Sequence, residues 1–209
     1  MSKALLSVFI FCLLYVPAPA QEQPVLPRGH VFFTTDFEGA DALKEWSGKA
    51  ALEPGFQGGH ALCVARPAGS AQGSTMVNVP LPVEQMRGYL VHFSAMIRAE
   101  DVSAKPQSWN GVKFMAPIVT ESGRSWPAAQ IDVGTFDWKR LTFAARVPAD
   151  AKSMSLCLGL EAVTGKAWFD DVRVTVGKPP IVRRPRAVAG PLYKGHDLPR
   201  LRGAMVSPE

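Results

Sequence analysis

The residues that could carry acid, base or nucleophilic chemistry are scattered through this 209-residue sequence. Hydrolysis by paired carboxylates needs two carboxyl groups about 5 to 10 Å apart in one cleft, whereas the acidic residues here lie mostly in predicted turns and at strand ends. The histidines show neither metal-ligand nor triad spacing; they are His30, His60, His92 and His196. We therefore expect residues 1–209 not to form an enzyme by themselves.

The elements that position any functional residues are clearest between Gly134 and Val176. Leu141, Phe143 and Ala145 alternate with polar or small residues, and a second run places apolar side chains at every other position from Met154 to Leu160. A period of two is typical of strands with one buried face. With turn residues between the runs, this stretch predicts three consecutive antiparallel strands that pair as a meander.

Shorter runs elsewhere indicate further strands and almost no helix. They lie at residues 31–37, 49–53, 61–66, 74–79, 89–98, 112–120 and 125–133, with a helical turn at 40–46 whose Trp46 closes one end of the core. About ten strands separated by turns predict an all-β fold, a two-sheet antiparallel jelly-roll sandwich.

The two ends of the sequence differ from this central part. Residues 1–20 have the charged start, apolar run and small-residue cleavage site of a secretory signal peptide, and the 13-residue apolar run is shorter than the roughly 20 residues that span a bilayer. We expect a soluble chain, secreted or periplasmic, with a leader at 21–29. A membrane anchor is the alternative.

The net charge of +5 comes from the C-terminal part of the sequence. From Gly177 onward there are 7 basic and 2 acidic residues, and 7 − 2 = +5, so the rest is neutral overall. Prolines and basic residues alternate over 177–200, as in a semi-rigid linker. We therefore expect no nucleic-acid binding. Cys63 and Cys157 would lie in an oxidising compartment, where they either pair or remain two separate thiols.

Several short motifs resemble the carbohydrate-binding modules of the CenC type, which are β-sandwich domains attached to polysaccharide-degrading enzymes. The matching residues are Gly134, Phe136, Trp138 and Arg140, then the run from Trp168 to Val172, and upstream Asp36 to Gly39, Trp46 and Gly58 to Leu62. The resemblance covers roughly residues 31–176 and implies a module at 30–176 that binds polysaccharide or oligosaccharide as a monomer.

The resemblance also implies one structural calcium ion between the opening and closing strands. Calcium takes six to eight oxygen ligands, and Glu38 and Asp170 match the ligand-bearing positions, with Asp36 and Asp171 as further candidates. The alternative is that these acidic residues cap turns and pair with Arg140 or Arg173.

Sugar binding in such modules depends on aromatic rings that stack on pyranose faces, with polar groups beside them. Trp138 and Trp168 match structural positions of the motif, whereas Trp109 and Trp126 lie in polar loops. We therefore expect Trp109 and Trp126 to bind ligand, with Lys113, Gln130 and Glu161 on polar strand faces. Packing within loops is the alternative role of both tryptophans.

The last residues, 201–209, resemble the first strand of a family 5 glycoside hydrolase barrel, in the segment from Leu201 to Ser207. They would be the start of a C-terminal catalytic domain in a longer protein. The leading hypothesis is thus a secreted, non-catalytic carbohydrate-binding module that targets a glycoside hydrolase to polysaccharide. A structural spacer or protein-interaction sandwich is the alternative, and an enzyme acting directly on glycosidic bonds is the third hypothesis.

Overall fold

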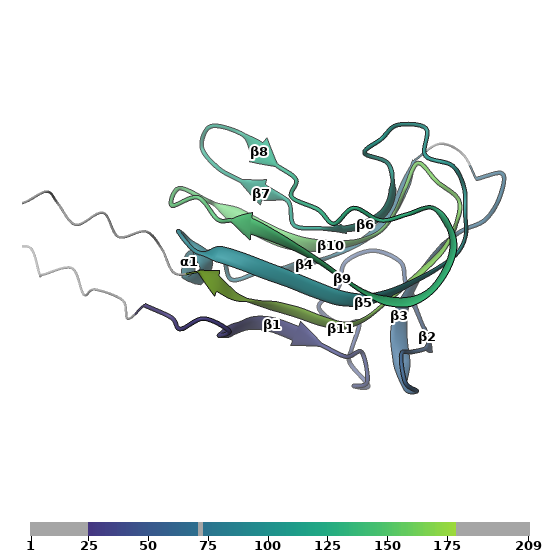
Figure 1. Ribbon diagram of the computed structural model, residues 1–209, viewed down its shortest axis with the longest axis horizontal. Helices are drawn as coiled ribbons and strands as arrows, with labels where there is room; N and C mark the ends of the chain where they lie inside the picture. Colours follow the sequence, from purple (N-terminus) through teal and green to yellow (C-terminus); the bar gives the residue numbers. More distant parts are fainter. Residues whose placement is uncertain (1–24, 71–72, 179–209) are drawn as a thin grey trace, which may run out of the picture.

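The computed structural model describes residues 25–70 and 73–178, which form a two-sheet β-sandwich (Figure 1). It has 11 strands and one helical turn, α1 (Val83–Met86). None of the helices in the described ranges is long and apolar enough to cross a membrane. The predicted signal peptide, residues 179–200 of the predicted linker and the segment 201–209 lie outside these ranges, so those three expectations stay predictions. Gly177 and Lys178, the first two residues of the predicted 177–200 linker, end the last strand.

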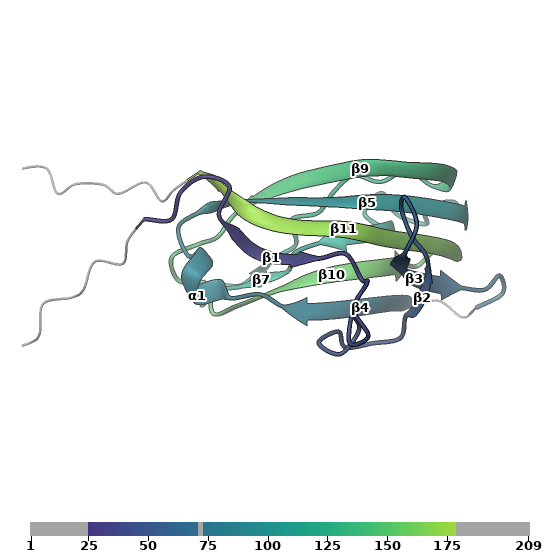
Figure 2. The same ribbon diagram turned by 90° about the horizontal axis from the view of Figure 1, so that it is seen from below.

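The first sheet has six strands in the order β2-β3-β11-β5-β9, with β1 also paired to β11. Their bounds are β1 (Val31–Thr35), β2 (Ala51–Pro54), β3 (His60–Arg66), β5 (Leu90–Val102), β9 (Gly134–Arg146) and β11 (Gly165–Lys178). Strand β11 pairs with β5 along one edge, and β3 and β1 share its other edge in succession. The last strand of the chain, β11, therefore lies in the middle of the sheet and pairs with the first strand, β1 (Figure 2).

The second sheet has five strands in the order β4-β10-β7-β8, with β6 also paired to β10. Their bounds are β4 (Ser74–Pro80), β6 (Gly111–Met115), β7 (Ile118–Val119), β8 (Arg124–Ser125) and β10 (Ser153–Glu161). Strands β6 and β7 pair in succession with one edge of β10. Pro117 separates them, because proline has no N–H to donate to a sheet.

Two sequence predictions need correction. Strands β9, β10 and β11 form as expected, but β10 belongs to the second sheet and the other two to the first, so they are not a meander. Alternation predicts which face is buried and not which strand lies alongside. The strand predicted over 125–133 is reduced to β8, although Ala129 N–H still donates to the Phe114 carbonyl at 2.9 Å.

The inner faces of the two sheets meet in one apolar core. Phe93 of β5 and Phe143 of β9 stack with ring centroids 4.4 Å apart, and Phe114 of β6 meets the edge of Phe143 at 5.0 Å. These three rings connect the first sheet to the second. At one end, Trp46 packs against Phe33 and Phe37, as predicted for a residue that closes the core.

A smaller apolar cluster lies apart from this core and contains Ala61, Cys63 and Trp168, with Trp138 packed against it. Trp168 is 3% exposed, its indole N–H donates to Glu53 Oε2 at 2.9 Å, and the Arg98 guanidinium lies 4.5 Å from its ring centroid. The predicted structural role of Trp168 is therefore confirmed. Trp138 is only partly buried, at the margin of the same cluster.

The two described cysteines are free thiols in different sheets, Cys63 on β3 and Cys157 on β10. The unpaired alternative is confirmed. Burial is the main cause that raises the pKa of Cys63 to about 12 and that of Cys157 to about 11. Because the thiolate is the reactive form, both buried thiols are unreactive at neutral pH.

The burial of Trp168 predicts a large effect on stability. Trp168→Ala removes a buried indole and leaves a cavity, so it should reduce the free energy of unfolding by about 3 to 5 kcal/mol. Trp109→Ala, at a tryptophan 66% exposed, should change it by less than about 0.5 kcal/mol. Urea unfolding of both variants makes the comparison, and equal losses would contradict this assignment of roles.

Candidate functional site

A cleft with a volume of about 390 Å³ lies on the outer face of the second sheet. Its residues come from the loop between β5 and β6, from β6 itself, from the segment after β8 and from the end of β10. In Figure 1 the β7–β8 hairpin and the loop before β6 both rise above β10 and β6. The cleft is therefore bordered by loops and has the sheet as its floor.

Period-two alternation decides which side chains reach this cleft. On β6, Phe114 points into the core while its neighbours Lys113 and Met115 line the cleft. After β8, Trp126, Ala128 and Gln130 line the cleft, and the alternate residues Ala129 and Ile131, which also border it, pack in the apolar core. The segment keeps this alternation because it stays bonded to β6 by Ala129 N–H and by the Pro127 carbonyl, which accepts from Ala116 N–H at 2.8 Å.

An ion pair forms the centre of the floor. The ammonium of Lys113 lies 2.6 Å from Glu161 Oε2, with side-chain exposures of 11% and 30%. Lys113 also donates a hydrogen bond to the backbone carbonyl of Trp109. Glu161 Oε2 has no well-directed hydrogen bond among the described residues, so charge attraction carries the contact. Burying an ion pair costs desolvation free energy, so we do not count this pair as a large contribution to stability. Its role is to hold the floor of the cleft and the loop of Trp109 in one arrangement.

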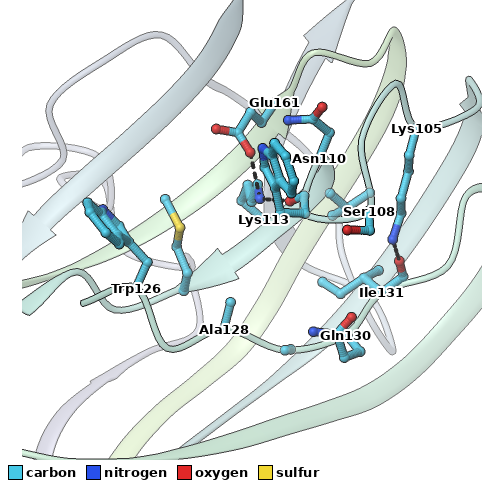
Figure 3. A pocket seen from close by; sticks show the side chains of 13 residues that line it. Lys105, Ser108, Asn110, Lys113, Trp126, Ala128, Gln130, Ile131 and Glu161 are labelled. Atoms are coloured by element: carbon cyan, nitrogen blue, oxygen red, sulfur yellow. Dashed lines mark hydrogen bonds and ion pairs between the residues drawn. The ribbon is translucent and has the colours of Figure 1, made fainter. Parts of the chain in front are cut away.

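Two exposed indoles line the cleft, Trp109 at 66% and Trp126 at 61% exposure. Figure 3 shows Trp126 at one end of the cleft, separated from Lys113, Asn110 and Glu161. A large exposed apolar ring is unfavourable in water, and two around one polar-floored cleft are typical of a binding surface. Such rings offer flat apolar faces to a ligand.

All five residues predicted to bind ligand line this one cleft: Trp109, Trp126, Lys113, Gln130 and Glu161. Sequence reasoning missed Lys105, Ser108 and Asn110, which line it as well. Lys105 crosses to the opposite wall, where its ammonium donates to the Ile131 carbonyl at 2.7 Å. Its loop has no periodicity, so nothing in the sequence indicates which of its side chains face the sheet.

The acidic residues predicted to bind metal lie near the junction of β1, β3 and β11. Asp170 is 4% exposed, and its two oxygens accept backbone N–H groups of Phe56 at 2.8 Å and Asp171 at 2.6 Å. Burial raises the pKa of the Asp170 carboxyl, those two hydrogen bonds act in the opposite direction, and the charges of Glu38 and Asp171 raise it further. Glu38 in turn accepts the His60 backbone N–H at 2.8 Å.

The other two acidic candidates have different partners. Asp36 Oδ1 accepts the Glu38 backbone N–H at 3.2 Å, as in a turn. Asp171 is ion-paired with Arg140, and with Arg173 at 2.9 Å. Among the described residues no three acidic, histidine or cysteine side chains are grouped as metal ligands. A calcium ion here would therefore need backbone carbonyls in addition to Glu38 and Asp170.

Comparison with known proteins identifies relatives in fold. No protein-family model matches the sequence, and no curated protein matches it. The CBM22-1 xylan-binding domain of Paenibacillus barcinonensis Xyn10C has a TM-score of 0.56 at 14% identity, over 73% of this chain and 98% of that one. The C-terminal family 22 carbohydrate-binding module of Clostridium thermocellum Xyn10B has a TM-score of 0.52 at 19% identity, over 70% and 93%.

A third structure contains the CBM22-1 and GH10 modules of Clostridium thermocellum Xyn10B in complex with xylohexaose. It has a TM-score of 0.54 at 14% identity, covering 75% of this chain and 30% of that one. Identities this low show a shared fold, which confirms the predicted two-sheet β-sandwich. The CenC-type resemblance stays a prediction, because these neighbours belong to family 22.

The ion pairs of Asp171 predict a pH-dependent contribution to stability. Burial acts to raise the pKa of Asp171, but the hydrogen bonds and charges of Arg140 and Arg173 outweigh it and lower the pKa. The stabilisation from the two ion pairs of Asp171 is therefore complete above the pKa of about 4 that an aspartate has in the unfolded state. It is lost as the pH falls through the lower pKa that Asp171 has in the folded state. Asp171→Asn should cost about 1 kcal/mol at pH 7.

Urea unfolding at neutral pH and at about pH 3 measures the difference in free energy of unfolding between the wild type and Asp171→Asn. This difference should be smaller at the acidic pH. Asp132→Asn is the matched control, since Lys139 lowers the pKa of Asp132 in the same direction but that pair is exposed. A loss that is the same at both pH values would contradict the ion-pair account.

Proposed function

We propose that residues 30–176 form a non-catalytic carbohydrate-binding module that holds a polysaccharide chain in the cleft between Trp109 and Trp126. The observation that carries this proposal is the presence of two exposed indoles in the lining of one cleft whose floor is polar. Sugar rings have apolar C–H faces and polar edges, so this arrangement offers both kinds of contact.

Each part of the cleft has a role in this account. The two indoles stack on pyranose rings, while Gln130, Asn110 and the Glu161 carboxylate hydrogen-bond to hydroxyl groups. Lys113 neutralises Glu161 and holds the Trp109 carbonyl. We therefore assign Lys113 mainly to positioning, although the sequence alone suggested contact with ligand.

The class of ligand is supported by the relatives in fold, which are described as a xylan-binding domain and as modules complexed with xylohexaose. We infer a β-linked plant polysaccharide, with xylan the first to test. Binding without hydrolysis is supported by the cleft itself, since Glu161 is the single carboxylate among its lining residues and paired-carboxyl hydrolysis needs two. The exposed indoles also favour binding over a purely structural spacer.

We further infer that this module is exported and tethered to a catalytic domain. The support is the signal-like sequence at 1–20, the proline-rich stretch from 177 and the segment 201–209. One relative in fold carries a family 22 module in the same chain as a GH10 module. The module would then raise the local concentration of an attached glycoside hydrolase on its substrate.

We also infer a structural calcium ion held by Glu38 and Asp170. In support, Asp170 is a nearly fully buried carboxylate with no cationic partner among the described ion pairs, and the charge of Glu38 acts on it. Gly55 and Gly59 bring the backbone so close to these two carboxylates that a Cβ at either position would contact them. A divalent ion there would offset the repulsion between them and tie β1 to β11.

Alanine substitution tests the binding site. Removing a ring that stacks on sugar should weaken binding by about 1 to 3 kcal/mol, with base stacking on aromatic side chains as the measured analogue. Trp109→Ala and Trp126→Ala should each show this loss by calorimetry on xylan, mannan and β-glucan. Trp138→Ala is the control outside the cleft. Retained affinity in both cleft variants would show that the site lies elsewhere.

Chelation tests the calcium proposal. A ligand bound only by the folded state at about 100 times its Kd adds about 2.7 kcal/mol to the free energy of unfolding. EGTA should therefore lower the melting temperature of the wild type, and Glu38→Gln or Asp170→Asn should abolish that response. Asp36→Asn, whose carboxylate bonds within a turn, should keep it. Superimposable melting curves with and without EGTA would rule out the ion.

A further inference from the structure

The charged groups in and around the cleft do not balance. Lys113 is neutralised by Glu161 at 2.6 Å, and just behind the wall Lys139 is neutralised by Asp132 at 2.9 Å. Lys105 lies within 4.0 Å of no carboxylate in the described part of the chain, and its hydrogen bond there is to the neutral Ile131 carbonyl. The three lysines and two carboxylates together leave one positive charge. Lys105 is the lysine without a carboxylate in contact, although its charge also acts on Asp132 from a greater distance.

The side chain of Lys105 is held in place by packing. Its stem lies against Gly111 at the start of β6, where a Cβ would approach Lys105 Cε at 2.8 Å. The chain then reaches across to Ile131 on the opposite wall. An ammonium fixed in this way has two N–H donors left and loses little rotamer freedom when it takes a further acceptor.

Two other polar groups of the lining lie at the same end of the cleft, and each can donate a hydrogen bond as well as accept one. Figure 3 shows Lys105, Ser108 and Gln130 at the same end of the cleft, away from Trp126, with the Glu161 carboxylate beside Lys113. Ser108 offers a hydroxyl and Gln130 an amide to the same space. A fixed positive charge beside groups that are able to donate suits a ligand group that only accepts hydrogen bonds and carries negative charge. A neutral sugar hydroxyl leaves that charge unpaired.

We infer that the cleft recognises an anionic sugar, one that carries a uronate carboxylate or a sulfate group, and that Lys105 is the residue that selects it. This inference rests on the proposed carbohydrate-binding function and specifies the class of glycan. The neutral rings of the chain stack on the tryptophans, and the anionic substituent lies at the Lys105 end. Charge selection would thus be separate from ring stacking.

The test compares two forms of one polysaccharide. Native glucuronoxylan and the same material with its carboxylates reduced to alcohols are titrated into the protein by calorimetry. The wild type should bind the native form about tenfold more tightly, the size of one charge-assisted hydrogen bond. The preference should decrease between about 20 mM and about 500 mM salt. A sulfated β-glucan against its unsulfated parent distinguishes sulfate from carboxylate as the preferred group.

Matched variants assign the effect to Lys105. Lys105→Gln removes the charge and keeps a donor for Ile131, so the ratio of native to reduced affinity should fall to about one, while Lys105→Arg should retain it. Lys152→Gln removes the same charge from the surface pair with Glu121 and should keep the wild-type ratio. Melting curves confirm that each variant folds.

The outcomes separate this inference from the function on which it rests. Equal binding of charged and uncharged partners by the wild type overturns the inference and leaves carbohydrate binding intact. A preference that survives in Lys105→Gln places the charge selection on another residue and also overturns it. Failure to bind any charged or neutral glycan would instead contradict the proposed function.

Discussion

The contact of Phe93, Phe143 and Phe114 is the packing interaction on which both the sandwich and its cleft depend. Phe93 and Phe143 stack within the first sheet, and Phe114 brings β6 of the second sheet against them. Aromatic contacts of this kind contribute about 0.5 to 1.5 kcal/mol beyond the area they bury. Because Phe114 alternates with Lys113 and Met115, the packing of Phe114 in the core also determines where Lys113 and Met115 lie on the cleft floor.

The polar part of the cleft is built on this anchored strand. Lys113 projects from β6 to Glu161 on the neighbouring β10, and it also holds the carbonyl of Trp109. Lys105 ties the same loop to Ile131 on the other wall. The exposed indoles are thus carried by segments bonded to rigid strands, which limits the entropy lost when a chain is bound. A binding surface prepared in this way is what the proposed function needs.

Much of this arrangement could be predicted from the sequence, and the reasons are physical. Alternation shows which face of a strand is buried, so the positions of Lys113 and Glu161 on polar strand faces follow from local pattern. The exposure of Trp109 and Trp126 was expected instead from the polar residues around them in their loops. Strand neighbours depend on contacts far apart in the chain, so the meander was wrong. The role of Lys105 was missed for a related reason, since a loop without periodicity gives no side-chain direction. For Asp171 the sequence left two roles open, metal binding or pairing with Arg140 or Arg173, and the structure shows both arginine pairs.

The central claim is that the cleft between Trp109 and Trp126 is where this protein binds polysaccharide. The most direct measurement is an NMR titration of the tryptophan indole N–H signals with xylohexaose, because stacking of a sugar ring shifts the signal of the indole it covers. The account predicts shifts for Trp109 and Trp126, with the signals of Trp46, Trp138 and Trp168 unchanged. Saturable shifts at Trp138 or Trp168, with Trp109 and Trp126 unaffected, would contradict it.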